Sequence, residues 1–300
     1  MLALVPANAQ VIAGVNVQQA VNSPFGQFLL SRSGPDGNGF DKMFQSTGFD
    51  PRRDLQSFVF ASTGPNSDAA QSNFVFIARG NFPAQRMRDQ ALAHGGTPQN
   101  FAGIDLYVSS DHGQKTAFGL LPDSGLAVFG DLASVQQVIS NRATPSAIDP
   151  ALQALIGKVS QANDAWFASL LSGSYLTQHL NGATGNSMKS QAQALQSVHQ
   201  AAGGLQFGDP IQLTFDAVTR SPKDAASLAD IFRFMASLVQ MGRQQNPQAD
   251  MLASALDGMV LNTSDNNFHM NLAIPEKSLE QLADSGIGAK RHHGSTTDKQ

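Results

Sequence analysis

A short pattern near the N-terminus returns about half a chain later, and it constrains the fold more than any other feature. Residues 7–13 and 162–168 both consist of Ala-Asn, two variable residues, two apolar residues and Ala. Each segment is apolar and too short for a helix, which predicts a strand. A segment that starts with Ser comes after each strand, at 23–30 and at 174–180. Ser is a preferred N-cap, so a short helix is expected after each strand.

Further matches occur in the same order along the chain. A strand is followed by Pro and a helix around Pro83 and again around Pro222. Residues 127–132 resemble residues 272–277, where a strand again runs into a helix. Self-similarity that recurs in one order is typical of repeat architectures. The sequence therefore predicts two tandem, diverged copies of one unit.

The predicted copies occupy residues 1–145 and 146–286, separated by turn-forming Pro and Ser residues. Residues 287–300 have no apolar periodicity and are expected to form a disordered tail. Each copy contains a strand, a helix, a strand pair, a helix, further strands and a last helix. Short turns between strands indicate antiparallel pairing. The fold class predicted is α+β, with helices covering one face of an antiparallel sheet in each copy.

Two longer helices are expected in the second copy. The Gln- and Ala-rich segment 188–202 favours a helix that ends at Gly203. A second helix opens at Ser221, which can serve as its N-cap. The apolar periodicity of that helix predicts a core-facing stripe. The stripe consists of Leu228, Ile231, Phe232, Met235, Leu238 and Val239.

Composition excludes several classes of protein. The chain has 300 residues, of which 41% are hydrophobic and only 14% charged, and a net charge of −4. A nucleic-acid-binding face would need clustered basic residues, and none is present, so no nucleic-acid partner is expected. No run of eighteen apolar residues occurs, so no transmembrane helix is expected. The chain lacks cysteine, which excludes disulfides and thiolate chemistry.

The N-terminal residues were searched for features of a signal peptide, which would indicate the cellular compartment of the protein. Residues 7–9 form an Ala-x-Ala sequence like a signal-peptidase site, but a basic region and a full apolar region do not precede it. The internal copy indicates that residues 7–13 belong to the fold. A periplasmic or secreted location is favoured if an upstream leader is missing from this sequence, and a cytoplasmic one otherwise. Absence of an in-frame leader in the upstream DNA would count against export.

Motifs for known chemistry are missing, including phosphate-binding glycine loops, zinc-binding helices and nucleophile elbows. The nearest approach to a catalytic pair is Asp111-His112, because a carboxylate can orient an imidazole as a general base. The competing interpretation is an ordinary turn between strands, since adjacent side chains rarely face each other. Asp105, Asp216 and Asp265 each lie in or beside a strand and could meet across a sheet. No cofactor or metal site is predicted.

Alternating aromatic residues occur on the predicted strands. They resemble a ligand-binding wall, but phenylalanines at every second position of paired strands are typical of a buried face. We therefore assign them to the core. The residues are Phe58, Phe60, Phe74, Phe76 and Phe101.

The N-terminal segment resembles a group of uncharacterised bacterial proteins that are predicted to be exported. The resemblance lies in Leu4-Val5-Pro6, Ala9 and residues 11–17, followed by Ser23-Pro24-Phe25-Gly26. It covers some thirty residues and begins with an L-x-P-x-x-A strand opening. The group has no assigned activity, so the resemblance implies at most an envelope location.

Three functions remain open from the sequence. The first is a non-catalytic envelope protein that binds a partner protein or small ligand between two similar lobes. The second is a hydrolase that uses Asp111 and His112, with Ser109 or Ser110 as nucleophile. The third is a carrier whose helices and sheet enclose an apolar ligand. The absence of catalytic motifs favours the first, although fold alone does not decide function.

Overall fold

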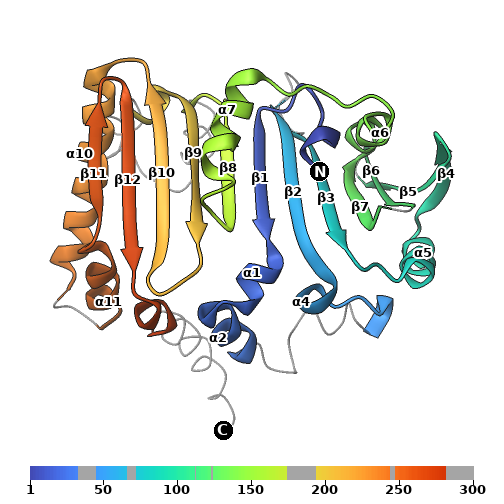
Figure 1. Ribbon diagram of the computed structural model, residues 1–300, viewed down its shortest axis with the longest axis horizontal. Helices are drawn as coiled ribbons and strands as arrows, with labels where there is room; N and C mark the ends of the chain where they lie inside the picture. Colours follow the sequence, from blue (N-terminus) through green and yellow to red (C-terminus); the bar gives the residue numbers. More distant parts are fainter. Residues whose placement is uncertain are drawn as a thin grey trace, which may run out of the picture. The chain divides into compact units, whose positions relative to one another are not determined.

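The computed structural model of the chain describes residues 1–32, 45–65, 72–111, 113–122, 124–173, 194–243 and 247–281 (Figure 1). The expected helix at 174–180 and the tail at 287–300 lie outside these residues. The chain divides into two compact units. The first comprises Met1–Asn22, Ser31–Ser172 and Gln200–Gly204, and the second comprises Ser23–Leu30, Gly173–His199 and Leu205–Gln300. These units differ in extent from the predicted repeats, which remain a prediction.

The first unit contains an antiparallel sheet in which eight strands have the order β8-β1-β2-β3-β7-β6-β5-β4. Ala102 and Gly103 take positive φ at the turn between β4 and β5. The strands are β1 (Val11–Asn16), β2 (Leu55–Pro65), β3 (Ser72–Gly80), β4 (Thr97–Phe101), β5 (Ile104–Asp111), β6 (Gln114–Leu121), β7 (Leu126–Asp131) and β8 (Ala165–Ser169).

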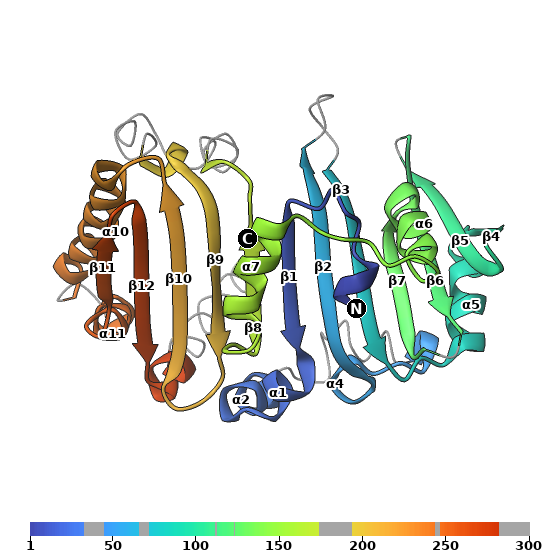
Figure 2. The same cartoon turned by 45° about the horizontal axis from the view of Figure 1, so that its top comes forward.

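The core of this unit lies on one face of the sheet. Side chains alternate along each strand, so Val59, Ile77 and Val128 lie opposite one another on adjacent strands and share a face. Helices α6 (Leu132–Ser140) and α7 (Pro150–Val159) contribute buried residues to the same cluster, and partly buried residues of a 3₁₀ turn at Leu2–Leu4 pack against it. Figures 1 and 2 show α6 beside β7 and α7 beside β8. We call this side of the sheet the core face.

Asp131 positions α6 on the core face. One carboxylate oxygen accepts a hydrogen bond from the backbone N–H of Ser134 at 2.9 Å and caps the helix. The other oxygen accepts one from the backbone N–H of Phe74 at 2.8 Å. A single buried side chain therefore fixes the start of α6 relative to β3.

The remaining helices of the first unit are short. α1 (Val17–Asn22) comes after β1, α4 (Pro51–Asp54) precedes β2, and α5 (Ala84–Ala93) links β3 to β4. A further helix, α2 (Pro24–Arg32), falls mainly within the second unit, and Ser23 accepts a hydrogen bond from Gly26 at its start. Helix α5 begins after Pro83 and has no side-chain hydrogen bond at its N-cap.

The second unit also has an antiparallel sheet, in the order β11-β12-β10 with β9 beyond β10. The strands that lie wholly within it are β10 (Ile211–Thr219), β11 (Val260–Ser264) and β12 (Asn267–Ile274), and its helices include α10 (Pro222–Met241) and α11 (Pro247–Leu256). Strand β9 (Val198–Gln206) is shared, because its residues Gln200–Gly204 belong to the first unit. Ser221 caps α10 by accepting from the backbone N–H of Asp224 at 3.2 Å. Phe232 of α10 stacks on Phe268 of β12, with ring centroids 5.1 Å apart.

Two expectations for the second unit are wrong. Residues 198–202 belong to β9 rather than to a helix, because pairing within a sheet overrides the helix propensity of Gln and Ala. The core-facing stripe of α10 also ends early. Its buried residues all lie between Ala225 and Ile231. Met235 and Leu238 are 38% and 46% exposed.

The α+β class with antiparallel sheets is thus confirmed, and the chain is free of cysteine. Helices on a single face are not confirmed. In the first unit α6 and α7 lie on the core face, whereas residues of α5 line a pocket with side chains of the opposite face. None of the helices that the structure describes is long and apolar enough to cross a membrane.

Candidate functional site

A row of aromatic residues crosses the first sheet on the face opposite the core. Strand register places Phe60 opposite Phe76, Phe76 opposite Phe129, and Phe129 opposite Phe118. The row continues to Tyr107 at one end, and through Ala13 to Phe167 at the other. One residue from each of seven strands therefore lies on a single line, and six of the seven are aromatic. We call this line the aromatic row, and its side of the sheet the open face.

The rings of the open face are in contact and partly exposed. Phe60 and Phe76 have centroids 5.0 Å apart, and Phe74 lies 5.9 Å from Phe76 and 6.1 Å from Phe129. Phe76 is 36% exposed and Phe129 is 45% exposed. Edge-on and tilted contacts of this kind are favourable for aromatic rings. The described part of the chain therefore presents a contiguous aromatic surface instead of isolated apolar side chains.

The assignment of these phenylalanines to the core is wrong for Phe58, Phe60, Phe74 and Phe76. Both faces of β2 and β3 are apolar, because Val59, Ala61, Val75 and Ile77 occupy the alternate positions and are buried beneath helices. The smaller residues take the core face. Phe101 does pack against the core cluster, as expected.

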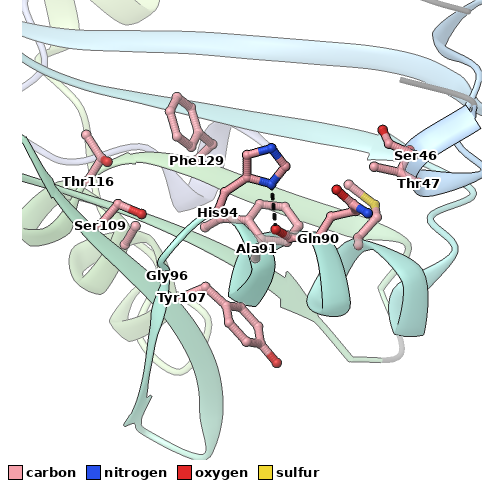
Figure 3. Close-up of a pocket in the computed structure, with 13 residues that line it drawn as sticks. Ser46, Thr47, Gln90, Ala91, His94, Gly96, Tyr107, Ser109, Thr116 and Phe129 are labelled. Atoms are coloured by element: carbon pink, nitrogen blue, oxygen red, sulfur yellow. Dashed lines mark hydrogen bonds between the residues drawn. The ribbon is translucent and has the colours of Figure 1, made fainter. Parts of the chain in front are cut away.

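At one end of the open face, α5 and the sheet together line a pocket of about 600 Å³ that is open to solvent (Figure 3). The helix contributes Met87, Gln90, Ala91 and His94, and the sheet contributes Tyr107, Ser109, Thr116, Ala117, Phe118 and Phe129. Ser46, Thr47 and Gly96 complete the lining. A volume of this size suits a drug-sized ligand. The aromatic row thus leads into a concave site.

The pocket is apolar with a few neutral polar groups. Its thirteen lining residues include no Lys, Arg, Asp or Glu. The ring nitrogen Nδ1 of His94 lies 2.8 Å from the backbone oxygen of Gln90. A carbonyl oxygen can only accept, so Nδ1 carries the proton and Nε2 of the neutral ring is an acceptor. Ser109 lies opposite Thr116 on the neighbouring strand.

The predicted catalytic pair lies at the end of β5. Asp111 is opposite Gln114 across a tight turn that includes Gly113 at φ +82°, and His112 lies outside the described residues. Of the two candidate nucleophiles, Ser109 lines the pocket, whereas Ser110 occupies the alternate strand position and does not. The turn agrees with the structural interpretation of Asp111-His112. The pairing of these two side chains remains untested.

The three aspartates named from the sequence have separate surroundings. Asp105 accepts a hydrogen bond from Asn100 at 2.9 Å in the first unit. In the second unit Asp216 contacts Nδ1 of His269 at 2.8 Å on an exposed surface, and Asp265 takes a positive φ in the turn between β11 and β12. Among the described residues, no three side chains of His, Asp, Glu or Cys come together as a metal site would need.

Sequence reasoning missed Phe118 and Phe129, the two rings that join the aromatic row to the pocket. A signal was available in the alternation of both strands, where Phe118 comes after Ala117 and Phe129 after Val128. The pairing of β3 with β7 places Phe129 beside Phe76, and this pairing of strands that are not consecutive in the chain is not visible in the sequence.

Comparison of the chain with models of known protein families found no match, and neither did searches of curated proteins and of solved structures.

Proposed function

We propose that the chain is a non-catalytic binding protein that holds an apolar ligand on the open face of its first unit. The observation that carries the proposal is the aromatic row that runs into the pocket beneath α5. Soluble proteins rarely leave a contiguous apolar surface uncovered unless it binds something. This function combines the binding protein and the carrier that the sequence leaves open. A site between two lobes and an envelope location remain predictions.

The energetics favour binding through the exposed rings. Burying a phenylalanine side chain stabilises a complex by about 1.5–3 kcal/mol before the cost of association is subtracted. Phe76 and Phe129 retain enough exposed surface for a ligand to gain part of this energy at each ring. Binding by stacking needs no charged groups, so it agrees with a pocket whose lining contains no Lys, Arg, Asp or Glu.

We further propose that the two predicted copies, residues 1–145 and 146–286, descend from a duplicated ancestor. In the first unit, β2 and β3 form a hairpin, α5 comes next, and β6 and β7 return in the order β3-β7-β6. In the second predicted copy, β9 and β10 form the hairpin, α10 comes next, and β11 and β12 return in the order β10-β12-β11. The same connectivity supports the tandem repeat. The hairpin of β4 and β5 is then an addition to the first copy.

Strand register requires one change to the residue alignment of the proposed copies. β1 and β8 are antiparallel neighbours, with Ile12 opposite Ala168 and Ala13 opposite Phe167. Copies related by a two-fold axis through such a pair keep equivalent residues on one face. The matched residues Ala13 and Ala168 lie on opposite faces. The alignment must therefore shift by one residue at this strand.

The corresponding open face of the second unit is polar. Asp216, His269 and Asn262 lie opposite one another on β10, β12 and β11. These strands correspond in connectivity to β3, β7 and β6, which carry Phe76, Phe129 and Phe118. A polar outer face is the usual state of an antiparallel sheet. The aromatic face is therefore specific to the first unit, which supports a binding role there.

The proposal is tested with Nile red, an uncharged dye that fluoresces in apolar surroundings. We expect the protein to bind the dye, and Phe129→Ser to weaken binding about tenfold, because one stacked ring contributes roughly 1–1.5 kcal/mol. Phe234→Ser is the matched control, since Phe234 is also an exposed phenylalanine but lies on α10 of the second unit. Equal affinities for both variants, or no binding by the native protein, would reject the proposal.

A further inference from the structure

The pocket beneath α5 limits the chemistry of a ligand more closely than any other described surface, because it combines a defined volume with directional polar groups. The polar row at Asp216 and His269 has the composition of a solvated strand surface. The exposed end of α10 and a second pocket beside Trp166 give no indication of an occupant among the described residues.

We propose that this pocket takes an uncharged, flat ligand that carries a hydroxyl group as a hydrogen-bond donor. This inference rests on the proposed binding function and adds the charge, shape and end group of the ligand. It separates neutral hydroxylated ring compounds from fatty acids, phosphates and amines of similar size.

The residues that line the pocket disfavour a charged ligand. A charged group that enters an apolar pocket loses its hydration and needs an opposite charge as compensation. None of the thirteen lining residues carries a fixed charge. Arg86, Arg88 and Asp89 lie on α5, but they are not among the lining residues. A carboxylate, phosphate or ammonium group would therefore be bound without a partner, and a neutral ligand would not incur this cost.

The shape of the pocket favours a flat ligand. Its sheet side presents the rings of Phe118, Phe129 and Tyr107, and Tyr107 and Phe118 are 6.5 Å apart with an interplanar angle of 34°. In Figure 3, the side chains of Gln90 and His94 extend from α5 towards Phe129, and the ring of Tyr107 points away from them. A helix facing a surface of adjacent rings leaves space for a flat ring system, which can stack on aromatic faces.

The imidazole of His94 favours a ligand with a hydroxyl group. Its Nδ1 donates to the backbone oxygen of Gln90, which fixes the tautomer and leaves Nε2 as an acceptor. Nε2 forms no hydrogen bond within the described part of the chain. A ligand hydroxyl can donate to it, and the hydroxyls of Ser109 and Thr116 can donate or accept in turn. A ligand with a hydroxyl donor gains this hydrogen bond, and a ligand without a donor does not.

The test compares three probes that share one ring system at pH 7: 2-naphthol, 2-methoxynaphthalene and 2-naphthoate. We expect the neutral hydroxyl probe to bind most tightly. The methoxy probe, which lacks the donor, should bind about fivefold more weakly, and the anionic probe at least about tenfold more weakly. Affinities are measured by calorimetry on the full chain. Naphthoate binding as tightly as naphthol would overturn the inference.

The variant His94→Leu tests whether His94 causes the preference for a ligand with a hydroxyl group. Leu removes the acceptor but keeps an apolar side chain, so the preference for naphthol over methoxynaphthalene should disappear while methoxynaphthalene binding stays within about twofold. Leu92→Gln on the same helix is the control, because Leu92 is exposed and does not line the pocket. A preference that survives His94→Leu would overturn the role of His94. If none of the probes nor Nile red binds, the proposed function itself fails, which is a distinct result.

Discussion

Gly14 shows how one missing side chain shapes the core face of the first sheet. A Cβ at this position would lie 2.5 Å from Trp166, which is directly opposite on β8. We expect Gly14→Ala to displace the indole and to lower the free energy of unfolding by about 1–3 kcal/mol, as overpacking does. Trp166 is the only tryptophan in the chain, so its fluorescence reports the displacement directly. An unchanged emission spectrum and unchanged stability would contradict this packing.

Gly157 provides the opposite case at the same scale. It lies within α7, and a Cβ there would meet nothing within 4 Å. Ala has a smaller conformational entropy cost than Gly in a helix. We therefore expect Gly157→Ala to raise the free energy of unfolding by about 0.5–1 kcal/mol, measured by urea denaturation. A loss of stability would mean that the surroundings of α7 are more crowded than the structure shows.

At the scale of the element, α10 shows that residues of one apolar stripe can differ widely in burial. Leu228 is 1% exposed, whereas Leu238 is 46% exposed on the same helix. We expect Leu228→Ala to cost about 2–5 kcal/mol and Leu238→Ala less than about 1 kcal/mol, because only the first leaves a cavity. Thermal or urea unfolding of the two variants measures the difference. Similar losses would place the second half of α10 in a core after all.

An ion pair at the start of α4 contributes to stability in a way that depends on pH. Arg52 donates to the Asp50 carboxylate at 2.8 Å, and this hydrogen bond holds the pKa of Asp50 below its ordinary value. Because the pKa is lower in the folded state, the pair stabilises the fold above the unfolded pKa of about 4. That contribution is lost as the pH falls through the lower folded-state pKa.

The change Asp50→Asn isolates this charge, because Asn also serves well as an N-cap. We expect it to lower the free energy of unfolding by about 1 kcal/mol at pH 7, and by progressively less as the pH falls below about 4. Urea unfolding across this pH range provides the measurement. A difference that stays constant with pH would show that the cap geometry, and not the charge, is responsible.

Elements were predictable where local signals and packing agree. Ser221 and Asp131 both cap helices as their sequence context indicates, and the turns around Gly113 and Gly125 connect the expected strands. The aromatic row was not predictable, because both faces of β2 and β3 are apolar and alternation alone does not say which face helices cover. The helix predicted at residues 198–202 was wrong for a related reason. The Gln and Ala residues of β9 favour a helix by themselves, and pairing with neighbouring strands overrides this preference.

At the scale of the whole molecule, the proposed duplication and the compact units divide the chain differently. α7 lies within the second predicted copy, residues 146–286, yet it packs in the first unit. Leu152, Leu155, Ile156 and Val159 of α7 are buried there and belong to the same cluster as Ile12 and Ala168. A sequence repeat is a unit of descent, whereas a compact unit is a unit of packing, so the boundaries of the two need not agree.

This difference can be measured in the full chain by hydrogen exchange. We expect Leu152→Ala to cost about 2–5 kcal/mol in the first unit, because it removes a fully buried side chain from that core. Protection should fall in β1 and β8, whose Ile12 and Ala168 share its cluster. Leu228→Ala is the matched change in the second unit, and it should lower protection in β10 and β12. If Leu152→Ala instead left β1 and β8 protected and affected only β10 and β12, α7 would belong to the second unit in packing as well as in sequence.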